Sequence, residues 1–282
     1  MGMADQGRAL VSVLVASHRR PAWLLEALAS LQAQQDPHWE AVVADDGSDP
    51  ATRAALAQAA AQDPRIRPLW LPHSGNLCRV RNAAFAAAQG DLIAFLDDDD
   101  TWLPDKLTWQ RRLLMEQPQA PLVCGQVRRF GDATGVWPRK LPRHFNFSRL
   151  LRGNQVAVGT VLARRAALPE RDPFDESLPQ VAEFALWLAL ARHADLACQG
   201  RVLARYRVHA QGRSRARTLE ADQLEILYDR LEQAGVPASA LSPGRRGIWR
   251  SRARLAPSLA DALPLWLKAW RPGSLPGRRS PA

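Results

Sequence analysis

Short apolar runs alternate with amphipathic segments through the first hundred residues of the chain. The runs have the length and composition of strands buried on both faces, and they occupy residues 11–15, 39–44, 66–71 and 92–96. Between them, apolar residues recur at helical spacing or alanine dominates, and this predicts helices at residues 21–35, 50–62 and 77–89. Such alternation of strand and helix indicates an α/β fold, with a doubly wound, mostly parallel sheet flanked by helices.

The pattern is less regular in the rest of the chain. It predicts a helix at residues 105–115, a loop at 131–146, and strands at 122–130, 156–163 and 202–206. Residues 183–192 are apolar almost all round, which is typical of a buried helix. An amphipathic helix at residues 216–233 leads into a segment rich in Pro, Gly and Arg. We therefore expect one α/β domain over residues 1–215 and a basic helical extension over residues 216–282.

The net charge of +10 is concentrated at the C-terminal end. Residues 201–282 contain 16 Lys and Arg against 6 Asp and Glu, whereas residues 1–200 contain 22 of each kind. This asymmetry favours an anionic partner for the extension. Residues 263–270 are apolar and aromatic, which suits peripheral contact with an anionic membrane. The alternative is a solvated basic helix together with a segment that packs back on the domain. No nucleic-acid-binding motif accompanies the arginines, so we expect no nucleic acid partner.

The sequence does not predict export or a membrane span. No apolar stretch reaches the roughly 18 residues that a span needs. Residues 1–10 lack the apolar core of a secretory signal. Cys78, Cys124 and Cys198 are scattered, which fits reduced thiols. We expect a cytoplasmic location, with the extension at the inner face of the cell membrane as a further hypothesis.

Four consecutive aspartates, Asp97 to Asp100, follow the predicted strand at residues 92–96. Adjacent like charges repel, so they need a cation or solvent beside them. Hard divalent cations bind carboxylates together with substrate phosphates, and open α/β sheets bind ligands where their strands end. The alternative is a solvated acidic turn before a helix. Another predicted strand ends in the acidic loop Asp45 to Ser48, and two acidic loops at one edge favour a metal-dependent site for a phosphorylated substrate.

Seven motifs then follow one another in a defined order. They are Val11–Val15 with the Ser17–Arg19 loop, Val43–Ser48, Arg81–Ala84, Phe95–Leu107, Phe174–Glu176, Glu183–Leu188 and Tyr206–His209. Their order and spacing resemble those of the family 2 glycosyltransferases, which have the GT-A fold. Each motif alone is weak, but the ordered set covers residues 10 to 215. The resemblance implies a nucleotide-sugar half over about residues 10–105 and an acceptor half over about residues 106–215.

The resemblance also implies where a donor binds. Ala16, Ser17, His18 and Arg19, together with Asp46, match positions that hold the nucleotide base and ribose in the family. A carboxylate suits the N–H group of uracil or guanine, so a UDP- or GDP-sugar is the expected donor. His18 stands where the family usually has Tyr, and this departure weakens the assignment of the base.

By the same resemblance, Arg81 lies near the phosphates of the donor; the alternative is an exposed charge at a helix end. Asp97 and Asp98 match positions near the ribose and the metal-bound waters. Asp99 matches the direct ligand of a divalent metal, Mn²⁺ or Mg²⁺, and His209 matches a histidine that sometimes completes the metal site. The metal would bridge the diphosphate and neutralise the charge that develops on the leaving group.

Glu183 matches the catalytic base of the family, which is usually the Asp of a Glu-Asp pair. Here the pair is Ala182-Glu183, so the side chain is one methylene longer and the preceding acid is missing. As a base, Glu183 would take the proton of the acceptor hydroxyl, and direct displacement implies inversion. The alternative is a glutamate that stabilises a helix N-terminus.

We expect an inverting, metal-dependent glycosyltransferase that acts in cell-surface glycan biosynthesis on a glycan or lipid-linked acceptor. One rival is a sugar nucleotidyltransferase, but the first loop lacks the glycines that such enzymes use to bind phosphate. The other rival is a non-catalytic protein that binds a nucleotide sugar or acts as a membrane-associated scaffold. The change at Glu183 is the feature that leaves this second rival open.

Overall fold

The computed structural model describes residues 9–210 and 217–270, and these form two compact units. The first, here called the sheet unit, comprises residues 9–146 and 155–210. The second, the helical unit, comprises residues 147–154 and 217–270. The sequence did not indicate that residues 147–154 group with the later helices, and the expected boundaries near residues 105 and 215 stay predictions.

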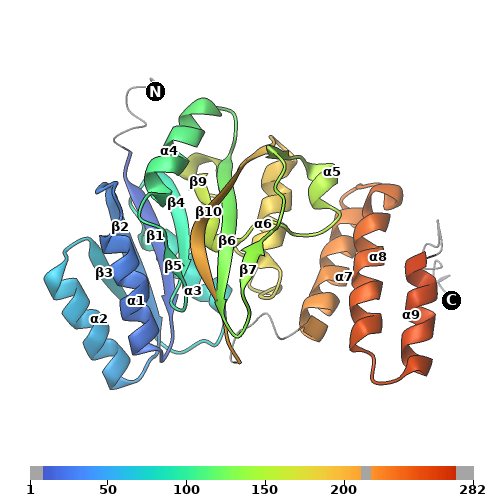
Figure 1. Cartoon of the computed structure of the whole chain (residues 1–282), viewed down its shortest axis with the longest axis horizontal. Coiled ribbons are helices and arrows are strands. Elements are labelled where there is room, and N and C mark those ends of the chain that lie inside the picture. Colours follow the sequence, from blue (N-terminus) through green and yellow to red (C-terminus); the bar gives the residue numbers. More distant parts are fainter. Residues whose placement is uncertain (1–8, 211–216, 271–282) are drawn as a thin grey trace. The chain divides into compact units, whose positions relative to one another are not determined.

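The sheet unit is built on one ten-stranded sheet (Figure 1). Its strands are β1 (Val11–Ser17), β2 (Trp39–Asp46), β3 (Ile66–Leu71), β4 (Leu92–Asp97), β5 (Thr101–Trp102), β6 (Leu122–Gly131), β7 (Gly135–Trp137), β8 (His144–Phe145), β9 (Leu162–Arg164) and β10 (Leu196–Val208). They lie in the order β3-β2-β1-β4-β9-β6-β10-β5, with β7 beside β6 and β8 beside β10. The four strands predicted in the first hundred residues are all present.

Parallel pairing dominates the sheet. β1 pairs in parallel with β2 and β4, β2 with β3, and β6 with β10 over long registers, whereas each antiparallel pair involves two or three residues. Ala16 of β1 lies opposite Asp97, and Ser17 lies opposite Asp45. The carboxyl ends of β1, β2 and β4 therefore meet at one edge, as the sequence predicted. This sheet flanked by helices is the GT-A type of α/β fold.

Helices cover both faces of the sheet. In the sheet unit they are α1 (Pro21–Gln32), α2 (Pro50–Gln62), α3 (Leu77–Ala87), α4 (Lys106–Glu116) and α6 (Ala182–Ala191), with 3₁₀ turns η1 (Val158–Thr160) and η2 (Arg165–Ala167). Asp49 caps α2 by accepting the Thr52 N–H at 2.9 Å. The third helix ends two residues earlier than predicted, because the Gln89 N–H is bonded to the side chains of Ser12 and Glu40.

The central strand β4 shows how the two faces are packed. Leu92, Ala94 and Leu96 belong to one apolar core together with residues of α1, α2 and α4. The alternate residue Phe95 points to the other face, where its ring contacts that of Trp187 in α6 at 6.1 Å between centroids. Both faces of β4 are buried, which fixes the strand that leads into the aspartates. The predicted buried helix at residues 183–192 is confirmed as α6.

The prediction was wrong in detail beyond residue 130. The expected strand at residues 156–163 is the turn η1 followed by the short strand β9, so its apolar character reflects burial rather than a continuous strand. The expected loop at residues 131–146 contains β7 and β8. β10 begins six residues before residue 202, with an irregular register between Cys198 and Ala204. These strands are defined by their partners in the sheet, which a local pattern does not reveal.

The helical unit consists of α5 (Phe147–Leu150), α7 (Arg217–Gln233), α8 (Ala238–Leu255) and α9 (Leu259–Trp270). Arg245 of α8 pairs with Asp229 and Glu232 of α7, and Arg252 of α8 pairs with Asp222 and Glu225. Part of the basic charge that suggested an anionic partner is thus neutralised within the unit. Among the described residues, no helix has both the length and the apolar character that crossing a bilayer requires.

We predict that Gly244→Ala destabilises the helical unit whereas Gly247→Ala does not. A β-carbon at Gly244 would lie 2.1 Å from the Tyr228 hydroxyl and 2.3 Å from the Leu151 carbonyl oxygen, while one at Gly247 would meet no atom within 4 Å. We expect Gly244→Ala to lower the free energy of unfolding by about 1–3 kcal/mol. Gly247→Ala should raise it by up to about 1 kcal/mol, because alanine favours helix. Urea unfolding followed by circular dichroism measures both, and equal stability of the two variants would contradict the predicted overlap.

Candidate functional site

The four aspartates form the turn between β4 and β5, at the carboxyl end of a central strand. The Asp100 N–H donates to the Asp97 carbonyl at 3.1 Å, which closes the turn. Asp98 and Asp100 are buried, and Asp97 and Asp99 are partly exposed. Their mutual repulsion is opposed by positively charged side chains from three other elements, described in turn below.

Arg81 of α3 joins the acidic turn to α6. Its guanidinium lies 2.5 Å from Asp97 Oδ1 and is also ion-paired with Glu183, and the residue is only 2% exposed. Burial alone would lower the pKa of Arg81, but the carboxylates of Asp97 and Glu183 raise it above its ordinary value. The alternative of an exposed charge at a helix end is therefore wrong. Glu183 lies in the first turn of α6, as the sequence indicated.

Asp98 is held by the loop that follows β1. Its Oδ2 accepts the His18 N–H at 3.1 Å, and its Oδ1 lies 3.2 Å from Arg20 Nη1. Burial and the neighbouring Asp99 raise the pKa of Asp98 to about 7, although Arg20 and the His18 N–H act in the opposite direction. Arg20 and the His18 N–H thus favour the ionised form of the Asp98 carboxyl.

Asp99 is bonded by two side chains at one oxygen. Arg20 Nη1 lies 2.6 Å from Asp99 Oδ2, and His209 Nε2 lies 3.0 Å from the same atom. The structure therefore brings together Asp99 and His209, the two residues expected to bind a metal. Their role as ligands stays a prediction.

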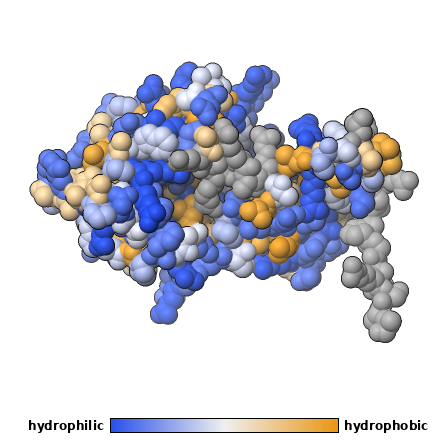
Figure 2. Space-filling view, turned by 90° about the horizontal axis from the view of Figure 1, so that it is seen from below, coloured by the Kyte–Doolittle hydropathy of each residue, from blue (hydrophilic) through white to orange (hydrophobic). Residues whose placement is uncertain are grey.

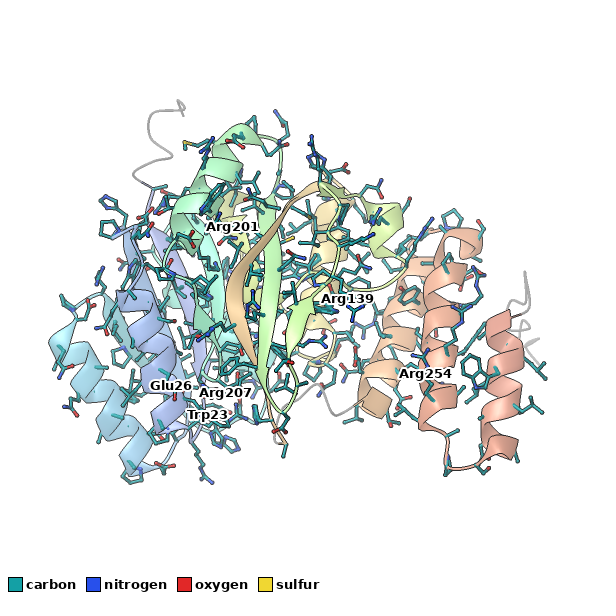
Figure 3. All side chains as sticks on the ribbon, viewed as in Figure 1. Trp23, Glu26, Arg139, Arg201, Arg207 and Arg254 are labelled. Carbon is teal, nitrogen blue, oxygen red and sulfur yellow. The ribbon has the colours of Figure 1, made fainter. Side chains whose placement is uncertain are left out.

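Arg207 at the end of β10 fixes the far side of the turn. Its backbone N–H donates to Asp100 Oδ1 at 2.8 Å, and its Nε donates to the Asp99 carbonyl at 2.9 Å. The guanidinium lies over the Trp23 ring at 5.0 Å and is ion-paired with Glu26. Figure 3 shows these three side chains gathered at the ends of α1 and β10. Burial raises the pKa of Asp100 well above its ordinary value.

Three carboxylates of the turn are close enough to share a cation. One oxygen from each of Asp97, Asp99 and Asp100 lies within 4.8 Å of the other two. An all-oxygen donor set of this kind suits Mg²⁺ or Mn²⁺. Asp100 was not among the metal ligands expected from the sequence.

Asp46 forms a second cluster at the end of β2. Its carboxylate accepts the Ser74 N–H at 2.7 Å, the Ser74 hydroxyl at 2.9 Å and the Gly75 N–H at 3.0 Å. Burial would raise the pKa of Asp46, but these hydrogen bonds and the nearby His73 lower it below its ordinary value. The Asp46 carboxylate thus organises the loop between β3 and α3, and its role toward a nucleotide base stays a prediction.

Two stacked imidazoles lie beside Asp46. The rings of His18 and His73 have centroids 4.5 Å apart and an angle of 19° between their planes. The Nδ1 atoms of both lie within 3.0 Å of the Asp46 carbonyl oxygen. The His18 ring is therefore stacked on the ring of His73.

The other residues expected to bind the nucleotide lie at the same edge of the sheet. Ala16 and Ser17 are the last residues of β1, and both are buried. Arg19 is exposed, has a φ of 53°, and donates its backbone N–H to Ser48 Oγ at 2.9 Å. No contact of the Arg19 side chain with the acidic turn occurs among the residues described.

Sequence reasoning missed Arg20, His73, Asp100 and Arg207 as parts of this cluster. Asp46 is the last residue of β2 and His73 lies two residues beyond the end of β3, so the rule that ligands bind where strands end, extended to β3, would have found His73. Arg20 lies in the same loop as the expected Arg19. Arg207 lies within the Tyr206–His209 motif. Figure 2, which views the molecule from below, shows hydrophilic residues predominating over the surface of the sheet unit on this side.

Comparison with known proteins decides the family. The family model described as glycosyl transferase family 2 matches residues 12–171, which is more than half of the chain. This chain belongs to glycosyl transferase family 2. It is therefore an enzyme, a glycosyltransferase, and both rivals considered from the sequence are disfavoured.

Two curated relatives match this glycosyltransferase over most of their length. A Bacillus subtilis protein named as a teichuronic acid biosynthesis glycosyltransferase is 28% identical, over 79% of this chain and 89% of its own. An Escherichia coli protein named UDP-Glc:α-D-GlcNAc-diphosphoundecaprenol β-1,3-glucosyltransferase is 25% identical, over 79% of this chain and 87% of its own.

A solved structure shares the fold of this glycosyltransferase. It is a mannosyltransferase from Pyrobaculum calidifontis, in complex with GDP-Man and Mn²⁺. The match has a TM-score of 0.67 and 18% identity, and it covers 95% of this chain and 77% of that one.

We predict that Arg81→Met destabilises this glycosyltransferase more than Arg79→Met, although both arginines lie on α3. Arg81→Met would leave two partly buried carboxylates without their partner, and we expect a loss of about 3 kcal/mol in the free energy of unfolding. The Arg79 pair with Glu176 is exposed, so its loss should cost less than about 1 kcal/mol. Urea unfolding followed by tryptophan fluorescence measures both, and similar losses would contradict the role given to the Arg81 bridge.

Proposed function

We propose that this glycosyltransferase moves a sugar, with inversion and with a divalent metal, from a UDP- or GDP-sugar to an acceptor hydroxyl in cell-surface polysaccharide biosynthesis. The observation that most supports this is the Arg81 bridge. It ties the proposed base, Glu183, to Asp97 at the start of the acidic turn. A base and a group of carboxylates fit for a metal are thereby held at one end of the sheet.

The residues present fit the expected metal. Asp99, with Asp97 and Asp100, would supply oxygen ligands, and His209 lies beside Asp99 to complete the set. A bound Mn²⁺ or Mg²⁺ would stabilise negative charge on the diphosphate. The mannosyltransferase with a similar fold was solved with Mn²⁺, which supports this choice.

The proposed reaction is a single displacement. The acceptor oxygen forms a bond to the anomeric carbon as its proton passes to a carboxylate oxygen of Glu183. The bond between the anomeric carbon and the diphosphate oxygen breaks, and the nucleoside diphosphate leaves with the electron pair. Attack from the face opposite the leaving group inverts the anomeric centre.

The nucleotide base would bind at the second cluster. His18, Arg19 and Asp46 lie where β1 and β2 end, beside Ala16 and Ser17. The His18–His73 pair offers an aromatic surface on which a base can stack. The Escherichia coli relative is named for UDP-Glc, and the mannosyltransferase of similar fold was solved with GDP-Man. Both UDP and GDP therefore belong in the test.

The acceptor is proposed to be a glycan or a lipid-linked sugar. The Escherichia coli relative is named for a diphosphoundecaprenol acceptor, and the Bacillus subtilis relative for teichuronic acid biosynthesis. In α9, Leu263 and Leu267 are exposed, and Lys268 and Arg254 lie exposed in the same unit. Figure 2 shows apolar groups at the surface of the helical unit. We propose a cytoplasmic enzyme that contacts an anionic membrane through this extension.

We predict that Asp99→Asn weakens metal-dependent nucleotide binding. Calorimetry with UDP and GDP, with Mn²⁺ or with EDTA, should show binding of one nucleotide that depends on Mn²⁺. Asp99→Asn should weaken it by more than about tenfold, because a metal ligand is lost. Asp91→Asn, an exposed aspartate before the same strand, serves as the control and should bind normally. Nucleotide binding that is unchanged in EDTA would contradict metal dependence.

We predict that Glu183→Gln binds the donor but does not transfer the sugar. Glutamine can still accept a hydrogen bond from Arg81, yet it cannot take a proton. Transfer of radiolabelled sugar to a panel of sugar-diphosphate lipids should fall about 10²–10⁴-fold, with nearly unchanged donor affinity. Glu116→Gln, an exposed glutamate of α4, is the matched control. A wild-type transfer rate in Glu183→Gln would show that the base is another residue.

A further inference from the structure

We propose that Arg20 neutralises Asp99 when no metal is bound. When a divalent cation binds, the Arg20 side chain leaves Asp99 and pairs with the diphosphate of the donor. The inference rests on the proposed metal and donor site. It goes beyond that site by assigning to Arg20 the coupling between metal binding and donor binding.

The position of Arg20 leaves its side chain free for this role. It is the residue immediately before α1, but its side chain does not cap the helix. Instead the guanidinium reaches across to the acidic turn, 3.2 Å from Asp98 Oδ1 and 2.6 Å from Asp99 Oδ2. One cationic side chain therefore spans two adjacent carboxylates, where a metal ion would otherwise neutralise the charge.

Arg20 is the most exposed of the three arginines on the turn. The side chain of Arg81 is 3% exposed and is held by two carboxylates. That of Arg207 is 16% exposed, lies over the rings of Trp23 and Phe130, and bonds both Glu26 and the Asp99 carbonyl. The side chain of Arg20 is 26% exposed and lies over the Trp23 ring at 5.5 Å, and among the described residues its ion pairs are with the two aspartates alone. Arg20 is thus the arginine that can leave without dismantling the turn.

The occupied oxygen of Asp99 explains why Arg20 has to leave. Asp99 Oδ2 already receives both Arg20 and His209, and the His209 ring packs edge-on against Trp23 with centroids 4.6 Å apart. A divalent cation bound to Asp99 would lie next to the guanidinium, and two like charges at one oxygen repel. His209 can stay, because a neutral imidazole is itself a metal ligand. Arg20 cannot act as a ligand, since a guanidinium does not lose its proton in proteins.

The donor offers Arg20 a new partner. A diphosphate brings negative charge to the same edge of the sheet, and a planar guanidinium pairs well with phosphate oxygens. Arg20 would pass from carboxylate to phosphate as the metal and donor bind. Each ligand then favours the other, because the metal releases Arg20 and the diphosphate stabilises the released arginine. Thermodynamic linkage makes this coupling reciprocal.

The test measures metal and nucleotide separately. Mn²⁺ alone is titrated by electron paramagnetic resonance, and UDP and GDP are titrated by calorimetry at saturating Mn²⁺. Arg20→Gln should bind Mn²⁺ alone about tenfold more tightly, yet bind the nucleotide about tenfold more weakly at saturating Mn²⁺. A merely structural role would weaken both. Arg112→Gln, which removes an equal charge from an exposed pair on α4, should change neither affinity.

A second variant tests the charge itself. Arg20→Lys keeps the cation, so its affinity for Mn²⁺ alone should stay near that of the wild type. Its nucleotide affinity should still fall, because an ammonium group does not form the paired hydrogen bonds of a guanidinium. Circular dichroism confirms that each variant is folded.

Three outcomes would count against these ideas, and they are distinguishable. Unchanged or weaker Mn²⁺ binding in folded Arg20→Gln would overturn the counter-cation role while leaving the proposed function intact. If Arg20→Lys bound Mn²⁺ as tightly as Arg20→Gln, the idea that the positive charge at residue 20 competes with the metal would be overturned. A wild-type enzyme that binds neither Mn²⁺ nor a nucleotide would overturn the proposed function itself.

Discussion

Repulsion among four adjacent carboxylates is the constraint around which this structure is arranged. The turn Asp97–Asp100 is stable because Arg20, Arg81 and Arg207 reach it from three different parts of the chain. Two of these arginines also pair with a carboxylate outside the turn: Arg81 with Glu183, and Arg207 with Glu26. Neutralising the turn therefore also assembles the site, since the same contacts bring α1, α3, α6 and β10 together.

The parallel register of the sheet supplies the second requirement. β1, β2 and β4 end within a residue or two of one another, so their loops meet without long connections. Both faces of β4 are buried, and this rigid strand fixes where the aspartates begin. The side chains proposed to act at this edge are thus carried by a strand that is buried on both faces.

Much of this was accessible from the sequence, and the limits have physical causes. Residues 11–97 have strong periodicity, so the strands, the helices and their shared edge were predicted, with element ends within three residues of those observed. β7, β8 and β9 are too short for a local pattern and depend on partners distant in the chain. Ordered motifs led to Asp99, His209, Arg81 and Glu183, whose roles stay predictions. The pairing of Arg20 with Asp98 and Asp99 depends on the folded chain and was not predicted. The identity of a loop residue does not show which carboxylate its side chain contacts in the folded chain.

The grouping of residues 147–154 with α7, α8 and α9 makes the helical unit discontinuous in the chain. Leu150 and Leu151 are fully buried, and the Tyr228 hydroxyl donates to the Leu151 carbonyl at 2.7 Å. During synthesis Leu151 leaves the ribosome 77 residues before Tyr228, the hydrogen-bond donor to its carbonyl. The sheet unit, which ends at residue 210, is therefore synthesised before this hydrogen bond can form. A chain that ended near residue 215 would lack Tyr228 and would leave the Leu151 carbonyl without this donor.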